Sequence, residues 1–372
     1  MIKVGITGQA GFIGTHLYEY LNLDKDRFSL IPFEDAYFED PLVFTDWVSQ
    51  CDAIVHLAAL NRHKNPDEIY KTNIKLVKDL ISALENSNST AHILFSSSTQ
   101  EMFDNPYGQS KKEGRELLIE WAERSGGKLT GLVIPNVFGP FGNPFYNSVV
   151  ATFCHLLAKE EEPSLQDDKS LRLIYVGELT KVLGDCILGN ESNHEYRISH
   201  TSEVKVSEIL ELLSGFKSAY ADRGELPELN NMFEVNLFNT FRCYMDIPGH
   251  FPVLLKQHID DRGSFVETMK LGMGGQVSFS TTNPGITRGD HFHTRKIERF
   301  AVIKGEAIIC LRRIGTEEVL EFHLNGSNPA YVDMPIWYTH NISNVGEGEL
   351  YTLFWINEFF DPDDPDTYYE TV

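Results

Sequence analysis

The sequence has few basic residues and no long apolar run. Among its 372 residues, 32 Lys and Arg face 54 Asp and Glu, which gives a formal net charge of −22. Nucleic acids and anionic membrane surfaces are bound through basic patches, so this acidic surplus argues against both as partners. A small anionic ligand is not excluded, because a few amides and cations can hold a phosphate on an acidic protein. Without a run of about 18 apolar residues, no transmembrane helix is expected.

Cysteine is also scarce. The five cysteines lie far apart and include no CxxC pair: Cys51, Cys154, Cys186, Cys243 and Cys310. Their odd number and their spacing fit neither a disulfide framework nor a thiolate zinc site, so free thiols are expected. Residues 1–8 form a strand running into a glycine turn and do not have the pattern of a signal peptide. We therefore expect a cytoplasmic protein.

The first half of the chain alternates between strand and helix patterns. Strands are predicted at 2–7, 28–33, 53–57, 92–95 and 129–134, and helices at 14–23, 73–85 and 111–124. This alternation predicts parallel pairing and a doubly wound α/β sheet of the Rossmann type.

The second half has a different pattern, with short alternating runs separated by turns rich in Gly and Asn. Such runs occupy 276–281, 300–303, 307–311 and 350–355, which predicts an all-β sandwich or barrel. Helices are predicted between the halves, at 206–216 and 233–244. We place an α/β domain at 1–245 and an all-β domain at 250–372. The acidic last dozen residues are predicted to form a solvated tail.

A glycine-rich turn follows the first predicted strand. This turn contains Gly8, Gly11 and Gly14 and leads into the first predicted helix. Phe12 and Ile13 lie between the last two glycines. Glycines allow a tight turn and a close approach of the backbone to a pyrophosphate, and the helix N-terminus offers free N–H groups. A dinucleotide cofactor is expected here.

The second predicted strand ends in Glu34 and Asp35. An acidic residue at this place binds the ribose hydroxyls and repels a 2′-phosphate, which favours NADH over NADPH. The sequence does not decide which of the two residues occupies the position, and both could simply cap the following segment.

Tyr107 and Lys111 are four residues apart and therefore share one helical face. A nearby ammonium is expected to lower the pKa of the phenol, and a serine from the strand end at 96–98 could orient a carbonyl. This trio suits proton transfer during reduction of a ketone by hydride.

The all-β half contains a cluster of potential metal ligands. His291 and His293 are two residues apart and would lie on the same face of one strand. Glu298 follows on the next predicted strand, and His340 comes from a later one. Three imidazoles and a carboxylate suit Zn²⁺, and also Fe, Mn or Ni.

The N-terminal motifs together resemble the extended short-chain dehydrogenases/reductases that act on nucleotide sugars. The motifs are Gly8–Gly14, residues 55–59, Asn73, 96–98, Tyr107 with Lys111, 136–140 and 172–176. The resemblance implies that Tyr107 is the general acid and that Lys111 binds the nicotinamide ribose. Ser98, or alternatively Ser97, would bind the substrate carbonyl. Leu57, Ala58, Ala59 and Asn136 would line the cofactor site. One departure is the short spacing of nine positions between Ser98 and Tyr107.

The C-terminal motifs resemble those of the cupins. Gly285, the four proposed ligands, Gly305 and a later Pro335 to Asn344 segment occur in cupin order, although Trp337 stands where the second motif usually has glycine. Residues 261–267 resemble the opening of dTDP-sugar 3,5-epimerases, in which Arg262 could meet a diphosphate. Further arginines that could do so are Arg172, Arg288 and Arg295.

A reductase joined to a cupin resembles the CapF-type family of bifunctional capsular-polysaccharide and O-antigen synthesis enzymes. The family implies C3 epimerisation of UDP-2-acetamido-2,6-dideoxy-β-L-arabino-hex-4-ulose by the cupin. The reductase domain would then reduce the C4 ketone to give UDP-2-acetamido-2,6-dideoxy-β-L-talose, a precursor of UDP-L-FucNAc. It also implies NADPH, against the preference argued from Glu34 and Asp35, and a homodimer. Zn²⁺ is the expected metal.

Three points stay open in the sequence. The epimerisation base could be Lys304, Tyr338 or His323. The metal could be catalytic or structural, and the cupin could serve only in sugar binding or dimerisation. An Fe(II) dioxygenase is a weaker alternative, because four protein ligands leave fewer open positions than the usual triad of such enzymes.

Overall fold

The structure is a computed structural model that describes residues 1–165, 167–261 and 263–372. The chain divides into two compact units. The first comprises Met1–Val149 and Asp168–Val206, and the second comprises Val150–Asp167 and Ser207–Val372. Each unit is described by itself.

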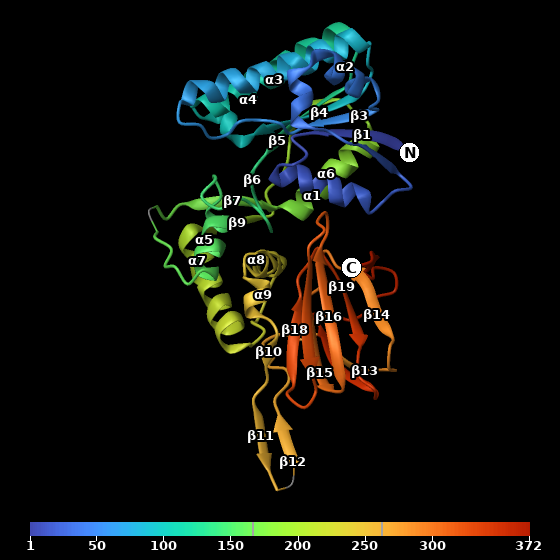
Figure 1. Ribbon diagram of the computed structural model, residues 1–372. Coiled ribbons are helices and arrows are strands. Elements are labelled where there is room, and N and C mark those ends of the chain that lie inside the picture. Colours follow the sequence, from blue (N-terminus) through green and yellow to red (C-terminus); the bar gives the residue numbers. More distant parts are fainter. Residues whose placement is uncertain (166, 262) are drawn as a thin grey trace. The chain divides into compact units, whose positions relative to one another are not determined.

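The first unit contains a six-stranded parallel sheet in the order β2-β1-β3-β4-β5-β8 (Figure 1). Its strands are β1 (Ile2–Thr7), β2 (Phe28–Ile31), β3 (Ala53–His56), β4 (His92–Ser98), β5 (Leu129–Ile134) and β8 (Asn193–Arg197). The strand order reverses between β1 and β3. In open α/β sheets, the crevice at the carboxyl ends of two such strands is where ligands bind.

Helices cover both faces of this sheet. Leu17 of α1 and Leu183 of α6 belong to the core on one face, and Phe44 of α2, Leu80 of α3 and Trp121 of α4 to the core on the other. The helices are α1 (Phe12–Asn22), α2 (Pro41–Ser49), α3 (Pro66–Ser87), α4 (Pro106–Ser125) and α6 (Val176–Gly189), with short helices η1 (Asp35–Glu39) and η2 (Thr99–Met102). The three-layer arrangement confirms the predicted Rossmann-type fold.

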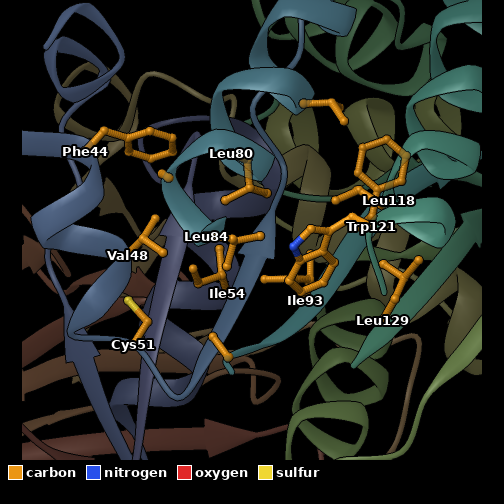
Figure 2. Close-up of a cluster of buried hydrophobic side chains, with 14 of the residues drawn as sticks. Phe44, Val48, Cys51, Ile54, Leu80, Leu84, Ile93, Leu118, Trp121 and Leu129 are labelled. Atoms are coloured by element: carbon orange, nitrogen blue, oxygen red, sulfur yellow. The ribbon is translucent and has the colours of Figure 1, made fainter. Parts of the chain in front are cut away.

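Figure 2 shows the core beneath α2, α3 and α4, where Leu80 and Trp121 pack against Ile54 and Ile93 of the sheet. Ile54 and Ile93 are fully buried. Helix α3 is amphipathic and presents Val77, Leu80 and Leu84 to this core, in the periodicity that predicted it. A separate small sheet of β6 (Asn136–Phe138), β7 (Ser170–Tyr175) and β9 (Ser202–Lys205) completes the unit.

The second unit contains two five-stranded antiparallel sheets, which confirms the predicted all-β class. One has the order β10-β18-β15-β20-β13 and the other the order β17-β16-β19-β14-β21. Their strands are β10 (Val253–Leu254), β13 (Gln276–Thr282), β14 (Thr287–Phe292), β15 (Glu298–Lys304), β16 (Glu306–Arg313), β17 (Val319–Asn325), β18 (Ala330–Met334), β19 (Tyr338–Asn344), β20 (Leu350–Ile356) and β21 (Tyr368–Tyr369). Ile309, Val332, Ile342 and Leu350 form part of the core of this unit.

A two-stranded hairpin of β11 (Gln257–Asp260) and β12 (Gly263–Val266) runs away from these sheets (Figure 1). The unit also contains α5 (Val149–Ala158), α7 (Val206–Phe216), η3 (Lys217–Asp222), α8 (Met232–Arg242) and α9 (Ile247–His250).

A buried polar network joins the helical segment of this unit to β15 and β18. Arg299 donates to Asp333 at 2.7 and 2.9 Å, and Tyr220 donates to the same carboxylate at 2.6 Å. Arg242 of α8 donates to the main-chain oxygen of Met334. Residues 207–245 thus pack with the all-β part of the chain, whereas the reductase domain was predicted to extend to residue 245. A compact structural unit need not have the same limits as a domain defined along the sequence. The domain boundary at 245–250 therefore stays a prediction.

The C-terminal segment departs from the sequence prediction. It was expected to be a solvated acidic tail, but its Asp366 is only 3% exposed and its Tyr368–Tyr369 pair forms β21 against β14. The reason is that the main chain around Asp366 and its carboxylate find hydrogen-bond donors on the protein, which composition alone does not reveal. All five cysteines are free, as predicted.

Candidate functional site

The glycine turn between β1 and α1 has the geometry that the sequence predicts. Gly8 has a φ of +68°, a left-handed conformation that favours glycine. A Cβ added at Gly8 would lie 2.9 Å from the backbone of Ala58, and one at Gly14 would lie 2.2 Å from the main-chain oxygen of Gly8. The turn therefore packs directly against the segment after β3, at the reversal of strand order. Helix α1 begins at Phe12 with no side-chain cap, so its first N–H groups are available to an anion.

The segment after β3 is held in place by two polar side chains. Thr7 is fully buried, and its hydroxyl lies 2.8 Å from His56 Nδ1 and accepts from the Ala58 N–H at 3.3 Å. Asn73 of α3 bonds both the N–H and the carbonyl of Leu60 and also donates to Ser110. Leu57, Ala58 and Ala59 are thereby fixed beside the glycine turn, half-buried, as a cofactor wall requires.

Glu34 and Asp35 lie shortly after the end of β2, where Asp35 begins η1, and both are exposed. The preceding Phe33 N–H donates to the side chain of Gln9 in the glycine turn at 3.3 Å, so the end of β2 lies against that turn. Glu34 makes no capping hydrogen bond to η1. Asn136, at the start of β6, is also exposed.

Tyr107 and Lys111 lie next to each other on α4. The Lys111 ammonium is 5.7 Å from the centroid of the Tyr107 ring and 5.2 Å from that of Phe95. Burial lowers the pKa of Lys111 to about 8. Burial, assisted by Tyr146, raises the pKa of Tyr107 to about 12. The predicted lowering of the Tyr107 pKa by Lys111 is therefore wrong in this structure, because desolvation of the phenol raises that pKa.

The three serines at the end of β4 have different partners. Ser96 is buried, donates to the carbonyl of His56 and lies 3.4 Å from Lys111 Nζ. Ser97 donates to Glu101, which forms a buried ion pair with Arg115. Ser98 is half-buried and accepts from the N–H of Gln100. Ser98 therefore stays the predicted carbonyl-binding residue, with Ser97 as the alternative.

The short connection between Ser98 and Tyr107 is filled by the η2 helix. Asn105 caps α4 by accepting from the Gly108 N–H at 2.8 Å. A Cβ at Gly108 would lie 2.1 Å from the carbonyl of Gln100, so η2 packs against the first turn of α4. The nine positions from Ser98 to Tyr107 are thus taken up by η2 and the cap of α4, and Tyr107 lies in the first turn of α4.

The four predicted metal ligands come together in the second unit. One ligand atom from each of His291, His293, Glu298 and His340 lies within 4.8 Å of all the others. His291 lies on β14, Glu298 begins β15 and His340 lies on β19. His293 and His340 reach Glu298 Oε2 through their Nε2 atoms, at 3.1 and 3.2 Å.

The residues of this cluster fit a metal ion. His293 Nε2, Glu298 Oε2 and His340 Nε2 are buried, and within the described residues their close polar neighbours are one another, so three polar atoms converge. Burial raises the pKa of Glu298, but the adjoining imidazoles lower it more, and the group is a carboxylate. Burial and the two other imidazoles lower the pKa of His291 to about 4, which leaves it neutral. Burial lowers the pKa of His293, but the neighbouring Glu298 raises it more, so His293 would give up its proton on binding a metal. Three imidazoles and a carboxylate are donor types that Zn²⁺ accepts.

Trp337 occupies the position where the resembling motif usually has glycine. Its φ is +62°, so the backbone keeps the left-handed conformation that explains glycine at this position. The main-chain N–H of Trp337 donates to the carbonyl of His293 at 2.8 Å, and its ring stacks on that of Phe292 with the ring centroids 5.7 Å apart. These contacts hold the turn before His340 against the strand that carries the other histidines.

Among the candidates for the epimerisation base, Tyr338 alone packs against the core of the unit on the face of β19 that carries Ile342. Lys304 and His323 are exposed. Burial raises the pKa of Tyr338 to about 12.

The arginines suggested for a diphosphate have protein partners. Arg172 pairs with Glu203, Arg295 pairs with Glu358 and Asp364, and Arg288 bonds Thr282. Arg262 lies outside the described residues.

Several residues that support the site carry no signal in the sequence. Thr7 and the Glu101–Arg115 pair are single polar residues within ordinary strand and helix patterns. Asp366 is one of several acidic residues in a row. Glu101 lies on η2 and Arg115 on α4, so helical spacing within one element cannot reveal that they pair, and only the fold shows it.

None of the helices in the described part of the chain has the length and apolar character of a membrane span.

Comparisons with known proteins cover both units. Residues 4–188 match the NAD dependent epimerase/dehydratase family, and residues 258–368 match the polysaccharide biosynthesis C-terminal domain. UDP-2-acetamido-2,6-beta-L-arabino-hexul-4-ose reductase of Pseudomonas aeruginosa strain PA103 is 32% identical over 371 residues, which are 99% of this chain and 98% of that protein.

Solved structures are also similar to this chain. The capsular polysaccharide assembling protein CapF of Staphylococcus aureus is 36% identical, with full coverage of both chains and a TM-score of 0.64. RMD of P. aeruginosa, solved with NADPH, is 22% identical over 59% of this chain and 83% of its own, with a TM-score of 0.53, and shows the fold alone.

Proposed function

The chain belongs to the CapF-type family of nucleotide-sugar reductases of polysaccharide biosynthesis, and we propose that it carries out two reactions on one UDP-amino sugar. The second unit epimerises C3 of UDP-2-acetamido-2,6-dideoxy-β-L-arabino-hex-4-ulose. The first unit then reduces the C4 ketone to UDP-2-acetamido-2,6-dideoxy-β-L-talose. The observation that carries this proposal is that this chain is 32% identical, along essentially its whole length, to a reductase of that 4-keto sugar. This chain also contains both candidate sites.

Reduction is assigned to Ser98, Tyr107 and Lys111. A reduced nicotinamide bound at the Gly8–Gly14 turn would supply the hydride for C4. Ser98 donates a hydrogen bond to the C4 oxygen, and Tyr107 transfers its proton to that oxygen as the C–H bond forms. A phenol with a pKa of about 12 is fully protonated at neutral pH, which suits a donor to an alkoxide.

Epimerisation is assigned to the cluster in the second unit. The C4 ketone acidifies the C3 proton, which is removed from one face and returned to the other. His291, His293, Glu298 and His340 would hold Zn²⁺, whose charge would stabilise negative charge on the C4 oxygen. We assign proton delivery to Tyr338, because it packs inward while Lys304 and His323 are exposed.

For the cofactor, the chain's own residues and its relatives differ. RMD was solved with NADPH, whereas Glu34 and Asp35 are exposed carboxylates shortly after the end of β2, which would repel a 2′-phosphate. We propose NADH as the preferred reductant. Steady-state rates with the two reductants at matched concentrations test this, and a large preference for NADPH would contradict it.

Proton NMR of the products from the 4-keto sugar in D₂O tests the two-reaction proposal. Without a reductant, the full-length protein is expected to place deuterium at C3 while leaving C4 oxidised. With a reductant, it is expected to give the talose product. The Glu298→Gln variant is expected to lose C3 exchange, and Tyr107→Phe is expected to keep it.

The alternative is that the second unit only binds sugar or mediates dimerisation. In that case the wild-type protein would reduce C4 without any exchange at C3. Exchange that persists in Glu298→Gln would instead separate epimerisation from the metal cluster.

A further inference from the structure

The buried carboxylate of Asp366 organises the segment that follows His293. Its Oδ1 accepts from the N–H of Thr294 at 3.0 Å and from the Thr294 hydroxyl at 2.7 Å. Its Oδ2 accepts from the N–H groups of Arg295 and Lys296, both at 3.0 Å. Four donors on three consecutive residues thus converge on one side chain that is 3% exposed. A carboxylate is the acceptor that such a set of N–H groups requires.

The main chain of Asp366 contacts a proposed ligand directly. The carbonyl oxygen of Asp366 accepts a hydrogen bond from His293 Nδ1. With the proton held on Nδ1, the lone pair of His293 lies on Nε2, the atom that is 3.1 Å from Glu298. Asp366 adopts a left-handed φ of 39°, which Asp and Asn tolerate better than most residues.

The rest of the C-terminal segment reinforces this contact along β14. Tyr369 pairs with His291 and Tyr368 with Phe292 in the antiparallel ladder. The Glu370 N–H donates to the carbonyl of Asp290 at 3.0 Å. The segment 364–372 therefore lies beside the strand that carries His291 and leads into His293.

We propose that Asp366 is a positioning residue for the metal cluster and that docking of segment 364–372 is coupled to metal binding. The inference rests on the metal site of the proposed function. By holding His293 in one tautomer and orientation, Asp366 lowers the cost of forming the site. Outer partners of this kind typically change metal affinity about 10–100-fold.

Coupling of this kind is reciprocal. If the docked segment increases the affinity of the metal, then the metal must stabilise the docked segment by the same factor. Removing the metal is therefore expected to raise hydrogen exchange at the N–H groups of residues 368–370, with little change in the first unit.

The test compares two substitutions in the full-length protein. Asp366→Asn keeps the shape and the backbone preference but places an NH₂ group against N–H donors. Asp364→Asn is the matched control, because Asp364 lies in the same segment and is exposed. Of residues 294–296, Asp364 bonds only Arg295. Zn²⁺ affinity is measured by competition with a chelator. We expect a loss of at least tenfold for Asp366→Asn and less than twofold for Asp364→Asn.

A purely structural role would give a different result. If Asp366 only stabilised the fold, its substitution would lower the melting temperature of the metal-free and Zn²⁺-loaded proteins equally, and the affinity would not change. We expect a larger decrease in the loaded protein, together with an altered visible spectrum of the Co²⁺ form. An unchanged Zn²⁺ affinity in folded Asp366→Asn and Asp366→Ala would overturn the inference. Failure of the wild-type protein to bind Zn²⁺ would instead overturn the metal site itself.

Discussion

Burial decides the chemistry of the residues at the reductase site. Lys111 is 3% exposed, and the desolvation of its ammonium lowers its pKa to about 8. The Tyr107 hydroxyl is desolvated as well, which moves its pKa in the opposite direction, to about 12. Spacing on a helix predicts that the two side chains are neighbours, but the balance between charge and desolvation depends on what covers them.

Tyr107→Phe tests the assignment of the general acid. The substitution removes the proton donor and keeps the ring, so kcat for C4 reduction is expected to fall about 10²–10⁴-fold. Binding of the reduced nicotinamide, followed by fluorescence, should change little. Tyr70→Phe is the matched control, because Tyr70 lies on α3 and bonds Glu113. Equal losses in both variants would contradict the assignment.

Lys111→Met is expected to inactivate reduction while stabilising the first unit. A lysine whose pKa falls from 10.5 to about 8 on folding destabilises the folded state below pH 8. That cost, on the order of 3 kcal/mol, disappears as pH rises from about 8 towards the unfolded value. Thermal unfolding at pH 7 should therefore show a higher melting temperature for Lys111→Met.

The exposed neighbour Lys112 provides the control for this measurement. Lys112→Met should leave the melting temperature nearly unchanged. The advantage of Lys111→Met over the wild type should shrink between pH 8 and pH 10. A destabilised Lys111→Met protein would show that the ammonium contributes to stability, against the direction of its pKa shift.

At the scale of elements, the turns that precede functional residues are set by close backbone contacts. The glycine turn after β1 has room for no side chain at Gly14, because a Cβ there would lie 2.2 Å from the main-chain oxygen of Gly8. The turn before His340 achieves a left-handed φ with Trp337, at a cost of roughly 1–3 kcal/mol. Stacking on Phe292 and the hydrogen bond to His293 offset that cost.

Gly14→Ala tests the role of the first turn. Its methyl group would push α1 away from Gly8, so the dissociation constant of the reduced nicotinamide is expected to rise at least tenfold, as measured by fluorescence titration. Gly189→Ala at the end of α6 is the matched control, because a Cβ there meets nothing within 4 Å. The control should bind the cofactor normally and be as stable as the wild type or slightly more stable. Normal binding by Gly14→Ala would contradict a role of this turn.

At the scale of the whole molecule, the net charge of −22 makes each anion site a local construction. The glycine turn offers main-chain N–H groups, which need no basic patch. The arginines proposed for the second diphosphate are held by carboxylates or hydroxyls within the described residues, apart from Arg262, which lies outside them. The two units also place the two proposed reactions on separate structural supports.

Removal of the metal tests this separation. A chelator is expected to abolish C3 exchange and to lower the melting temperature of the second unit, because buried polar atoms of Glu298, His293 and His340 lose their common partner. At a free metal concentration about 1,000 times the dissociation constant, bound metal stabilises by about 4 kcal/mol. Cofactor binding should not change. Simultaneous loss of cofactor binding would contradict independent sites, and an unchanged melting temperature would contradict a bound metal.

The sequence by itself determined the class of each half and which candidate metal ligands group together. Hydrophobic periodicity depends on neighbouring residues alone, so the patterns at 129–134 and 206–216 coincide with β5 and α7. The grouping of the four candidate ligands was likewise predictable, because strand alternation predicts His291 and His293 on one face and the motif order adds Glu298 and His340.

Only the tertiary structure decided which polar groups are buried together and with what partners. The last dozen residues are acidic in composition, yet Asp366 is buried because four N–H and O–H donors from residues 294–296 converge on it. The direction of the Tyr107 pKa shift and the pairing of Glu101 with Arg115 likewise depend on burial and on contacts between separate elements. Desolvation and hydrogen bonding arise between segments far apart in the chain, and periodicity along the sequence carries no record of them.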